Sequence, residues 1–291
     1  MKRRYYSLLL LLPVLILSCG KEVSLETGAK PGDSTGTPIS NNCILAKIVQ
    51  ADQATGKAEI AFVSGFNSEN KVVTHDVIDS GSNVIINSFS LSYPTGRVQI
   101  DAEQYFVVNA DGRVSEFHGY EYPDDNTTEK FTVRYTYNAA GQMTLRTETY
   151  DTLPGVVQYQ MRFTYSGGNL TKEEYEGNTG RSFVKIADIS FTYDASKTVK
   201  SFLYLQGIAP EISLFQTAIN AGVNNTNPVS RIVTSTYNPT TGAVINSFTT
   251  NFSNYVINSN NYVQSFDVSG NDYVAGGITA GSKYRLSYNC F

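Results

Sequence analysis

The chain has 291 residues and carries 22 basic against 26 acidic side chains, which gives a formal net charge of −4. An acidic chain is a poor binder of nucleic acid, and 2 histidines and 3 cysteines leave little material for a metal or cofactor site, so none is expected. The 20 tyrosines and 15 phenylalanines, together with many Asn, Ser, Thr and Gly residues, are typical of an all-β protein.

The first residues have the pattern of a bacterial lipoprotein signal peptide. A basic start is followed by an apolar run over residues 8–17, interrupted only by Pro13, and by Ser18 directly before Cys19. This run is about ten residues long, whereas a membrane-spanning helix needs roughly 20. We therefore expect residues 1–18 to be removed and Cys19 to be lipidated, which would attach the mature chain to a membrane.

The composition of residues 19–42 predicts a lipidated flexible tether. The segment is rich in Gly, Ser, Thr and Pro and has no periodic apolar residues, so it cannot bury enough surface to fold. Its stretch Gly20-Lys21-Glu22 is similar to the short charged signals that direct Bacteroidota lipoproteins to the outer face of the outer membrane, although a solvated linker has the same composition. We expect the protein at the outer membrane, on its periplasmic face or at the cell surface.

Residues 43–291 are expected to form a single β-repeat domain with a cysteine near each end. Cys43 opens this region and Cys290 is the penultimate residue. In an oxidising envelope the two most simply form a disulfide, which would join the first strand to the last. Two separate buried thiols are the alternative.

Three segments of this domain follow one pattern and end at Tyr137, Tyr165 and Tyr193, 28 residues apart. A fixed period of this size indicates a repeated supersecondary unit. Within residues 131–137 aromatic and β-branched side chains alternate with polar ones, so each segment predicts a strand with one buried face. The three tyrosines share the phase of the apolar residues, which makes them core or ligand-facing aromatics.

A turn pattern follows each of these strands. In Asn138-Ala-Ala-Gly141 the Asn starts the turn and the Gly supplies a positive φ. A second strand then returns, as in residues 143–150. The unit is a β-hairpin, and hairpins stacked in order predict an antiparallel meander that is curled into a half-barrel or barrel.

One insertion interrupts the period within residues 193–237. Its residues 210–222 place Ile212, Phe215 and Ile219 at helical spacing with a Gly at the end, which predicts one short helix. The apolar stripe is expected to pack on the concave side of the sheet. The alternative is that this helix is a lid over a ligand cavity.

These features together resemble a family of Bacteroidota lipoproteins whose hairpin repeats are similar to the Tyr-Asp repeats of Rhs proteins. The resemblance rests on the lipid-attachment site, the Tyr-Asn/Asp-x-x-Gly hairpins, the late insertion that ends in Asn-Asn-x-x-Pro, and the two outer cysteines. It implies a porin-like fold and no established activity or catalytic residues.

A barrel that spans a membrane also has alternating strands. Simple alternation puts Lys172 and Glu174 on the same strand face as Leu170, which leaves no clean lipid-facing band. We therefore expect a domain that is held near the membrane by its tether and does not cross it.

Candidates for chemistry are few. His75 and His118 are expected to be exposed strand or turn residues, and neither has a second His at ligand spacing. The acidic runs at residues 124–126 and 173–174 lack the spacing of a calcium loop and are expected to be solvated charges. An enzyme would need one of the histidines to meet an acid and a nucleophile in a cleft.

Tyr150 and Tyr175 differ in strand phase from the apolar residues Met143 and Leu170, so they are expected at the surface. Exposed tyrosines can stack on sugars, which keeps glycan binding as a minor hypothesis.

The anchor, the tether and the repeats, without a catalytic set, predict a non-enzymatic, lipid-anchored cell-envelope protein. Its sheet would present a surface to an envelope or extracellular partner or give structural support. The alternative is a carrier of an apolar, lipid-like molecule on the concave side, lined by aromatics such as Phe215.

Overall fold

The computed structural model describes residues 43–124, 127–200, 210–223, 225–271 and 280–291. Over these residues the chain forms one antiparallel sheet of 16 strands and the short helix α1 (Pro210–Phe215). The strands are β1 (Cys43–Asp52), β2 (Ala58–Phe66), β3 (Val72–Asp79), β4 (Val84–Ser90), β5 (Arg97–Gln99), β6 (Tyr105–Val108), β7 (Val114–Asp124), β8 (Thr127–Tyr137), β9 (Met143–Tyr150), β10 (Val157–Ser166), β11 (Asn169–Asn178), β12 (Phe183–Tyr193), β13 (Val229–Tyr237), β14 (Val244–Ile257), β15 (Val263–Gly270) and β16 (Ser282–Cys290).

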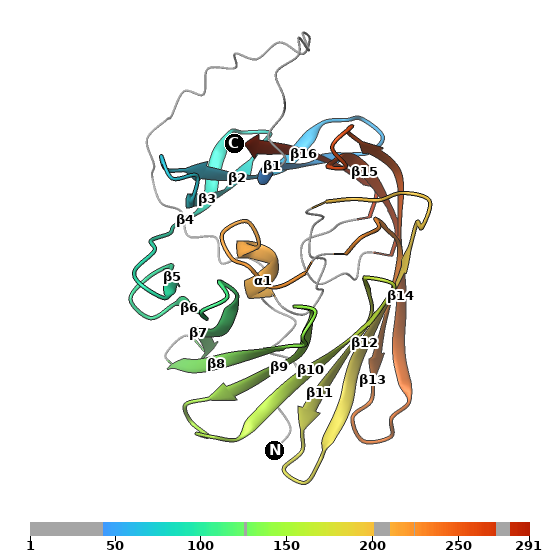
Figure 1. The fold of residues 1–291 in the computed structure, drawn as a ribbon. Helices are drawn as coiled ribbons and strands as arrows, with labels where there is room; N and C mark the ends of the chain where they lie inside the picture. The colour runs from blue at the N-terminus through green and yellow to red at the C-terminus, as the bar shows by residue number, and fades with distance from the viewer. Residues whose placement is uncertain (1–42, 125–126, 201–209, 224, 272–279) are drawn as a thin grey trace.

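The sheet is a meander whose order is rotated relative to the chain. Consecutive strands pair from β1 to β4 and from β5 to β16, and β1 also pairs with β16, so β4 and β5 are the two ends of the sheet. The sheet is not closed and curls around α1 (Figure 1). The predicted all-β antiparallel meander with one helical insertion is confirmed, but the helix ends at Phe215 instead of reaching residue 222.

A β-bulge recurs near the start of the odd-numbered strands. In β9, for example, Tyr137 pairs with Met143 and Thr136 pairs with Leu145, so Thr144 is skipped. The same skip follows the first apolar residue of each related strand and falls on Val73, Ser115, Thr144, Thr171, Ser230 and Gln264. A bulge shifts the alternation of the strand by one residue. The third residue after the first apolar one therefore points inward, and these positions are the buried residues His75, Phe117, Arg146, Glu173, Ile232 and Phe266.

Tyrosines at or near the ends of β8, β12, β14 and β16, and Tyr93 shortly after β4, fasten each of these strands to the start of the preceding strand. Tyr137 donates a hydrogen bond of 2.8 Å to the carbonyl of Val114, the first residue of the neighbouring strand β7. Equivalent bonds join Tyr93 to Val72, Tyr193 to Leu170, Tyr255 to Val229 and Tyr288 to Val263. Each hydroxyl thus satisfies a backbone carbonyl at the start of a bulged strand, which explains the recurring tyrosine in the sequence.

The residue after the tyrosine builds the turn. The side-chain Oδ1 of Asn138 accepts hydrogen bonds from the backbone N–H groups of Ala140 and Gln142, both at 3.0 Å. Gly141 has a φ of 78°, a conformation that only glycine adopts easily. The side chains of Asn67, Asn109 and Asn258 accept the same pair of backbone bonds in their turns. Side chains therefore specify these hairpins locally.

The first and last strands are joined covalently. Cys43 and Cys290 lie opposite each other in the β1–β16 register and form a disulfide with a sequence separation of 247. The backbone N–H of Cys43 also donates to the hydroxyl of Tyr262 at 3.1 Å. The predicted signal peptide, Cys19 and the tether lie outside the described residues, as do residues 125–126 of the acidic run at 124–126. No helix in the described part of the chain is long and apolar enough to cross a membrane.

Candidate functional site on the concave face

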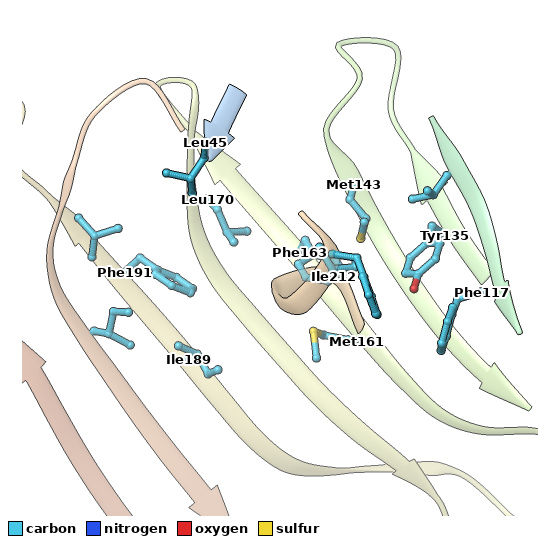
Figure 2. Close-up of a cluster of buried hydrophobic side chains, with 14 of the residues drawn as sticks. Leu45, Phe117, Tyr135, Met143, Met161, Phe163, Leu170, Ile189, Phe191 and Ile212 are labelled. Atoms are coloured by element: carbon cyan, nitrogen blue, oxygen red, sulfur yellow. The ribbon is translucent and has the colours of Figure 1, made fainter. Parts of the chain in front are cut away.

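Helix α1 lies against the concave face of the sheet and fills part of it. Ile212 is fully buried and lies among apolar residues of neighbouring strands, including Met161 and Phe163 (Figure 2). The ring of Phe215 meets the rings of Phe89 and Phe106 edge to face, at centroid distances of 5.3 and 5.9 Å. The helix thus packs as a plug between strands that are far apart in the sequence.

A row of aromatic rings crosses the concave face beside the helix. Neighbouring rings are 4.6–6.4 Å apart between centroids, which is the range for favourable aromatic pairs. In sheet order, the row contains Phe106, Phe117, Phe131, Tyr150, Tyr159 and Tyr175. It supplies a continuous wall over six adjoining strands, β6 to β11.

Buried charges hold the helix to the sheet. Arg146 of β9 is only 3% exposed and forms ion pairs of 2.8 Å with Glu148 and with Glu211 in the first turn of α1. The hydroxyl of Tyr135 donates to Glu211 at 3.0 Å, and that of Tyr150 donates to Glu148 at 2.7 Å. A buried guanidinium needs such partners, because an unpaired buried charge is strongly destabilising.

The pKa values of these groups follow from this arrangement. Burial alone would lower the pKa of Arg146, but the carboxylates of Glu211 and Glu148 raise it well above its usual value. Burial, and then the negative charge of Glu148, raises the pKa of Tyr150. Burial and Glu211 do the same for Tyr135. The cluster therefore keeps a positively charged arginine and neutral tyrosines at neutral pH.

Glu173 of β11 is a buried acid of a different kind. It is 0% exposed, and neither carboxyl oxygen has a hydrogen-bond partner among the described residues. Phe163 and Ile189 lie opposite it on the neighbouring strands. Burial raises the pKa of Glu173 well above its usual value, so the carboxyl is held in its neutral form.

Several expectations about strand faces are wrong, and the bulges are the reason. Tyr150 and Tyr175 are buried instead of exposed, and Glu173 is buried instead of solvated. Lys172 and Glu174 do not share the face of Leu170. The bulge at Thr171, directly after Leu170, shifts the alternation and places both charges on the outer face. Simple alternation from the first apolar residue therefore gives the wrong face after each bulge.

The aromatics predicted as core or ligand-facing belong to the apolar cluster of the sheet. Phe215 is buried, and Tyr137, Tyr165 and Tyr193 are partly buried against the core. The hydroxyl groups of Tyr137 and Tyr193 point to backbone carbonyls. Burial raises the pKa of both tyrosines.

His75 is buried, in contrast to the exposed position expected for it. Its Nδ1 lies 3.4 Å from Oγ of Ser64, which lies 3.2 Å from Oγ1 of Thr217 beyond α1. The ring stands 6.3 Å from those of Phe62 and Phe215. Burial lowers the pKa of His75, so it is a neutral core residue that links β3 to the helical insertion.

His118 lies on the outer face and has two polar partners. Its Nε2 is 3.0 Å from Glu116 and its Nδ1 is 3.3 Å from Oγ1 of Thr132, while Tyr105 stacks on its ring at 4.5 Å. Arg134 binds the same Glu116. The carboxylate, imidazole and hydroxyl follow one another as in a catalytic relay, but they lie on the convex wall away from the cleft described below. Among the residues that the structure describes, no group of three or more His, Cys, Asp or Glu could hold a metal ion.

A partly open cleft of about 680 Å³ lies where the chain enters β1. Its walls come from the start of β1, from the segments around β5 and β6, and from residues 216–222 after α1. Ile44, Leu45 and Ile219 contribute apolar surface, and Asn109 and Asn220 contribute polar groups. The volume is in the range of small-molecule sites.

Two porin-like proteins among the solved structures have a similar fold. A porin-like protein from Bacteroides vulgatus ATCC 8482 matches with a TM-score of 0.54 and 13% identity, over 85% of this chain and 99% of that chain. A porin-like protein from Bacteroides uniformis ATCC 8492 matches with a TM-score of 0.53 and 10% identity, over 87% of this chain and 98% of that chain. No protein-family model and no curated protein matches the sequence. The likeness shows a shared fold, while the lipoprotein and Tyr-Asp repeat parts of the resemblance remain predictions.

Proposed function

We propose that the protein is a non-enzymatic, lipid-anchored component of the cell envelope whose curled sheet is a rigid scaffold for interaction or structural support. The observation that carries this proposal is the helix that is fixed on the concave face. Helix α1 fills part of this face, and the buried ion pairs of Arg146 with Glu148 and Glu211 hold the helix in place. A scaffold of this kind needs a fixed shape and no reactive group.

The charged side chains on the outer face favour a sheet whose outer side is surrounded by water. Lys185 lies 3.1 Å from Glu174 and 3.3 Å from Asp188, and Lys172 lies 2.7 Å from Glu174. Charges in the middle of a strand are costly against lipid chains. The porin-like fold of the two neighbours is consistent with an envelope protein, and the ion pairs favour one that stands beside the bilayer.

Lipidation at Cys19 would anchor this scaffold, with residues 19–42 as the tether to Cys43. The test is metabolic labelling of expressing cells with a palmitate analogue. We expect label on the wild-type chain and none on Cys19→Ala, which should also leave the membrane fraction. Unlabelled wild-type protein would contradict the anchor.

The proposal that the protein is not an enzyme needs a separate test. Membrane fractions from a deletion strain should retain all the hydrolytic activities of the parent strain. Loss of one activity that the wild-type gene restores, and that a His118→Ala variant does not restore, would identify an enzyme and refute this part of the proposal.

A carrier of an apolar ligand is the second candidate, and the 680 Å³ cleft favours it. Native mass spectrometry of the purified protein with added fatty acids measures this directly. A carrier would bind one fatty acid per chain, and Ile219→Asp in the cleft wall would reduce the binding. Protein at its calculated mass under all conditions would refute the carrier.

A further inference from the structure

The cleft beside the start of β1 has a buried apolar floor and a polar mouth. Leu45 and Val98 form the floor, are only 7% and 5% exposed, and belong to the apolar cluster of the sheet. Asn109 and Asn220 also line the cleft, but both are exposed to solvent. A site with this arrangement fits a ligand that has an apolar chain at one end and a polar group at the other.

The two asparagines lie in segments that are bonded to each other. Asn109 begins the turn between β6 and β7, and Asn220 belongs to the segment that follows α1. The backbone N–H of Val114, the first residue of β7, donates to the carbonyl of Asn220 at 2.9 Å. This bond holds the segment after α1 against the end of the turn. The polar part of the mouth is therefore built by two fixed pieces of backbone.

The side-chain amides of both asparagines have free donors. Oδ1 of Asn109 accepts hydrogen bonds from the backbone N–H groups of Asp111 and Arg113, both at 3.0 Å. Oδ1 of Asn220 accepts from the backbone N–H of Gly222, also at 3.0 Å. Neither Nδ2 group has a hydrogen-bond partner among the residues that the structure describes. Because an amide NH2 group only donates, these two side chains fit a ligand group with acceptor oxygens.

The cleft lies at the rim of the sheet where the predicted tether joins the domain. Cys43, the first residue of β1, lines the cleft, and so does Gly96 directly before β5. The starts of β1 and β5 lie at the same rim, because neighbouring strands of the sheet are antiparallel. A Cβ atom added at Gly96 or at Gly112 would meet no heavy atom within 4 Å, so the wall is open at these two lining residues. A chain anchored through Cys19 would be held to the membrane from this rim.

We propose that the cleft binds an acyl lipid in one direction. The hydrocarbon chain contacts Leu45 and Val98, and the oxygens of the carboxyl or ester group accept hydrogen bonds from the amides of Asn109 and Asn220. The inference rests on the carrier candidate above and adds the direction of the ligand and the residues that recognise its polar end. Neutral donors bind a carboxylate and an ester alike. A free fatty acid and a membrane phospholipid therefore present the same chemistry to this site.

Transfer of lipids from vesicles to the protein tests this proposal. The protein is the full chain carrying Cys19→Ala, which removes the predicted lipidation site. Phosphatidylcholine vesicles are loaded with radiolabelled palmitate, methyl palmitate or hexadecane, and the label in the protein fraction is measured after the vesicles have been removed by centrifugation. Palmitate and methyl palmitate carry acceptor oxygens, whereas hexadecane has the same apolar character without them. We expect all three probes to be bound through the apolar floor, and only the first two to depend on the asparagines.

Changing asparagine to aspartate removes the donor and keeps the turn. The remaining oxygen can still accept the backbone bonds of the turn, while the NH2 group is replaced by a second oxygen. The double variant Asn109→Asp, Asn220→Asp should bind methyl palmitate about tenfold more weakly than wild type, because two hydrogen bonds are lost. Its binding of hexadecane should not change. Asn258→Asp is the matched control, because Asn258 builds the same kind of turn and does not line the cleft, and it should bind all probes like wild type.

The outcomes separate this inference from the carrier candidate. If no probe passes to the protein, the carrier and the inference are both refuted. If methyl palmitate binds equally well to wild type and to the double variant, the protein is a carrier, but the asparagines do not recognise the polar end and the inference is overturned. Phosphorus in the protein fraction would identify a membrane phospholipid as the ligand, and palmitate without phosphorus would identify a free fatty acid.

Discussion

Replacing Glu173 by leucine is expected to stabilise the protein at neutral pH. The carboxyl is fully buried without a hydrogen-bond partner among the described residues, and it lies between Phe163 and Ile189. A buried polar group without a partner costs about 1–3 kcal/mol, and an apolar side chain of similar volume removes that cost. For a domain of this size 1 kcal/mol corresponds to about 2–4 °C, so the unfolding midpoint should rise by roughly 2–12 °C.

The gain in stability of Glu173→Leu over the wild-type protein should increase as the pH rises. Burial raises the pKa of Glu173 in the folded protein above its usual value of 4.5. Between the two pKa values the folded state keeps a proton that the unfolded state has lost. The stability linked to this proton is therefore fully present below pH 4.5 and is lost as the pH rises through the folded-state pKa. Glu173→Leu does not have this loss, so its advantage over wild type should grow with pH.

Thermal unfolding of both proteins from pH 4.5 upward measures this difference. Glu174→Gln is the matched control, because Glu174 is the next residue but lies outside and is paired with Lys172 and Lys185. The hydrogen bond from Lys172 holds the pKa of Glu174 below its usual value, so its contribution is lost as the pH falls. That contribution is small, a few tenths of a kcal/mol, because the pair is partly exposed. A Glu173→Leu variant that is no more stable than wild type at neutral pH would refute the reasoning.

Three further outcomes follow from the structure. Arg146→Ala should lower the free energy of unfolding by about 3–5 kcal/mol, because it leaves buried carboxylates uncompensated, and the double variant Arg146→Met, Glu211→Leu should recover part of this loss. Urea unfolding measures both. Tyr137→Phe should cost about 1 kcal/mol through one lost hydrogen bond without changing the circular dichroism spectrum. Replacing Cys43 and Cys290 by serine should lower the free energy of unfolding by roughly 5 kcal/mol in the chain-entropy model. Urea unfolding under non-reducing conditions measures this loss. Equal stability of the two proteins would contradict a stabilising disulfide.

The sequence predicts the hairpins of this fold because local side chains specify them. Asn138 and Gly141 set their turn through bonds within a few residues, and the alternation before Tyr137 identifies a strand whatever its partners are. Strand number and the open ends at β4 and β5 depend on pairing between distant segments, which no local pattern encodes. The sequence therefore predicts the repeating unit and leaves the closure of the sheet open.

The buried charges could not be found by alternation alone. Counted from Met143, a regular strand would turn Leu145 and Thr147 inward, whereas the bulge at Thr144 turns Arg146 and Glu148 inward instead. A signal was present, because β3, β7, β9, β11, β13 and β15 each have an apolar residue at or next to their start, and a second buried series begins three residues after it. Aligning the strands at their first apolar residue, instead of at the tyrosines, would have shown that series.

The residues in that series explain why the insertion settles on the concave face. The position is apolar in Phe117, Ile232 and Phe266, and polar in His75, Arg146 and Glu173. His75 contacts Phe215, and its partner Ser64 contacts Thr217, while Arg146 binds Glu211, so two of these polar side chains meet residues 210–217. A helix held only by apolar contacts could occupy several positions along the sheet, because the hydrophobic effect is not directional. Hydrogen bonds at two separate strands fix one position, whereas Glu173 has no hydrogen-bond partner among the described residues and only adds cost. If Glu173→Leu stabilises the protein and Arg146→Ala destabilises it, then Arg146 positions the helix and Glu173 does not.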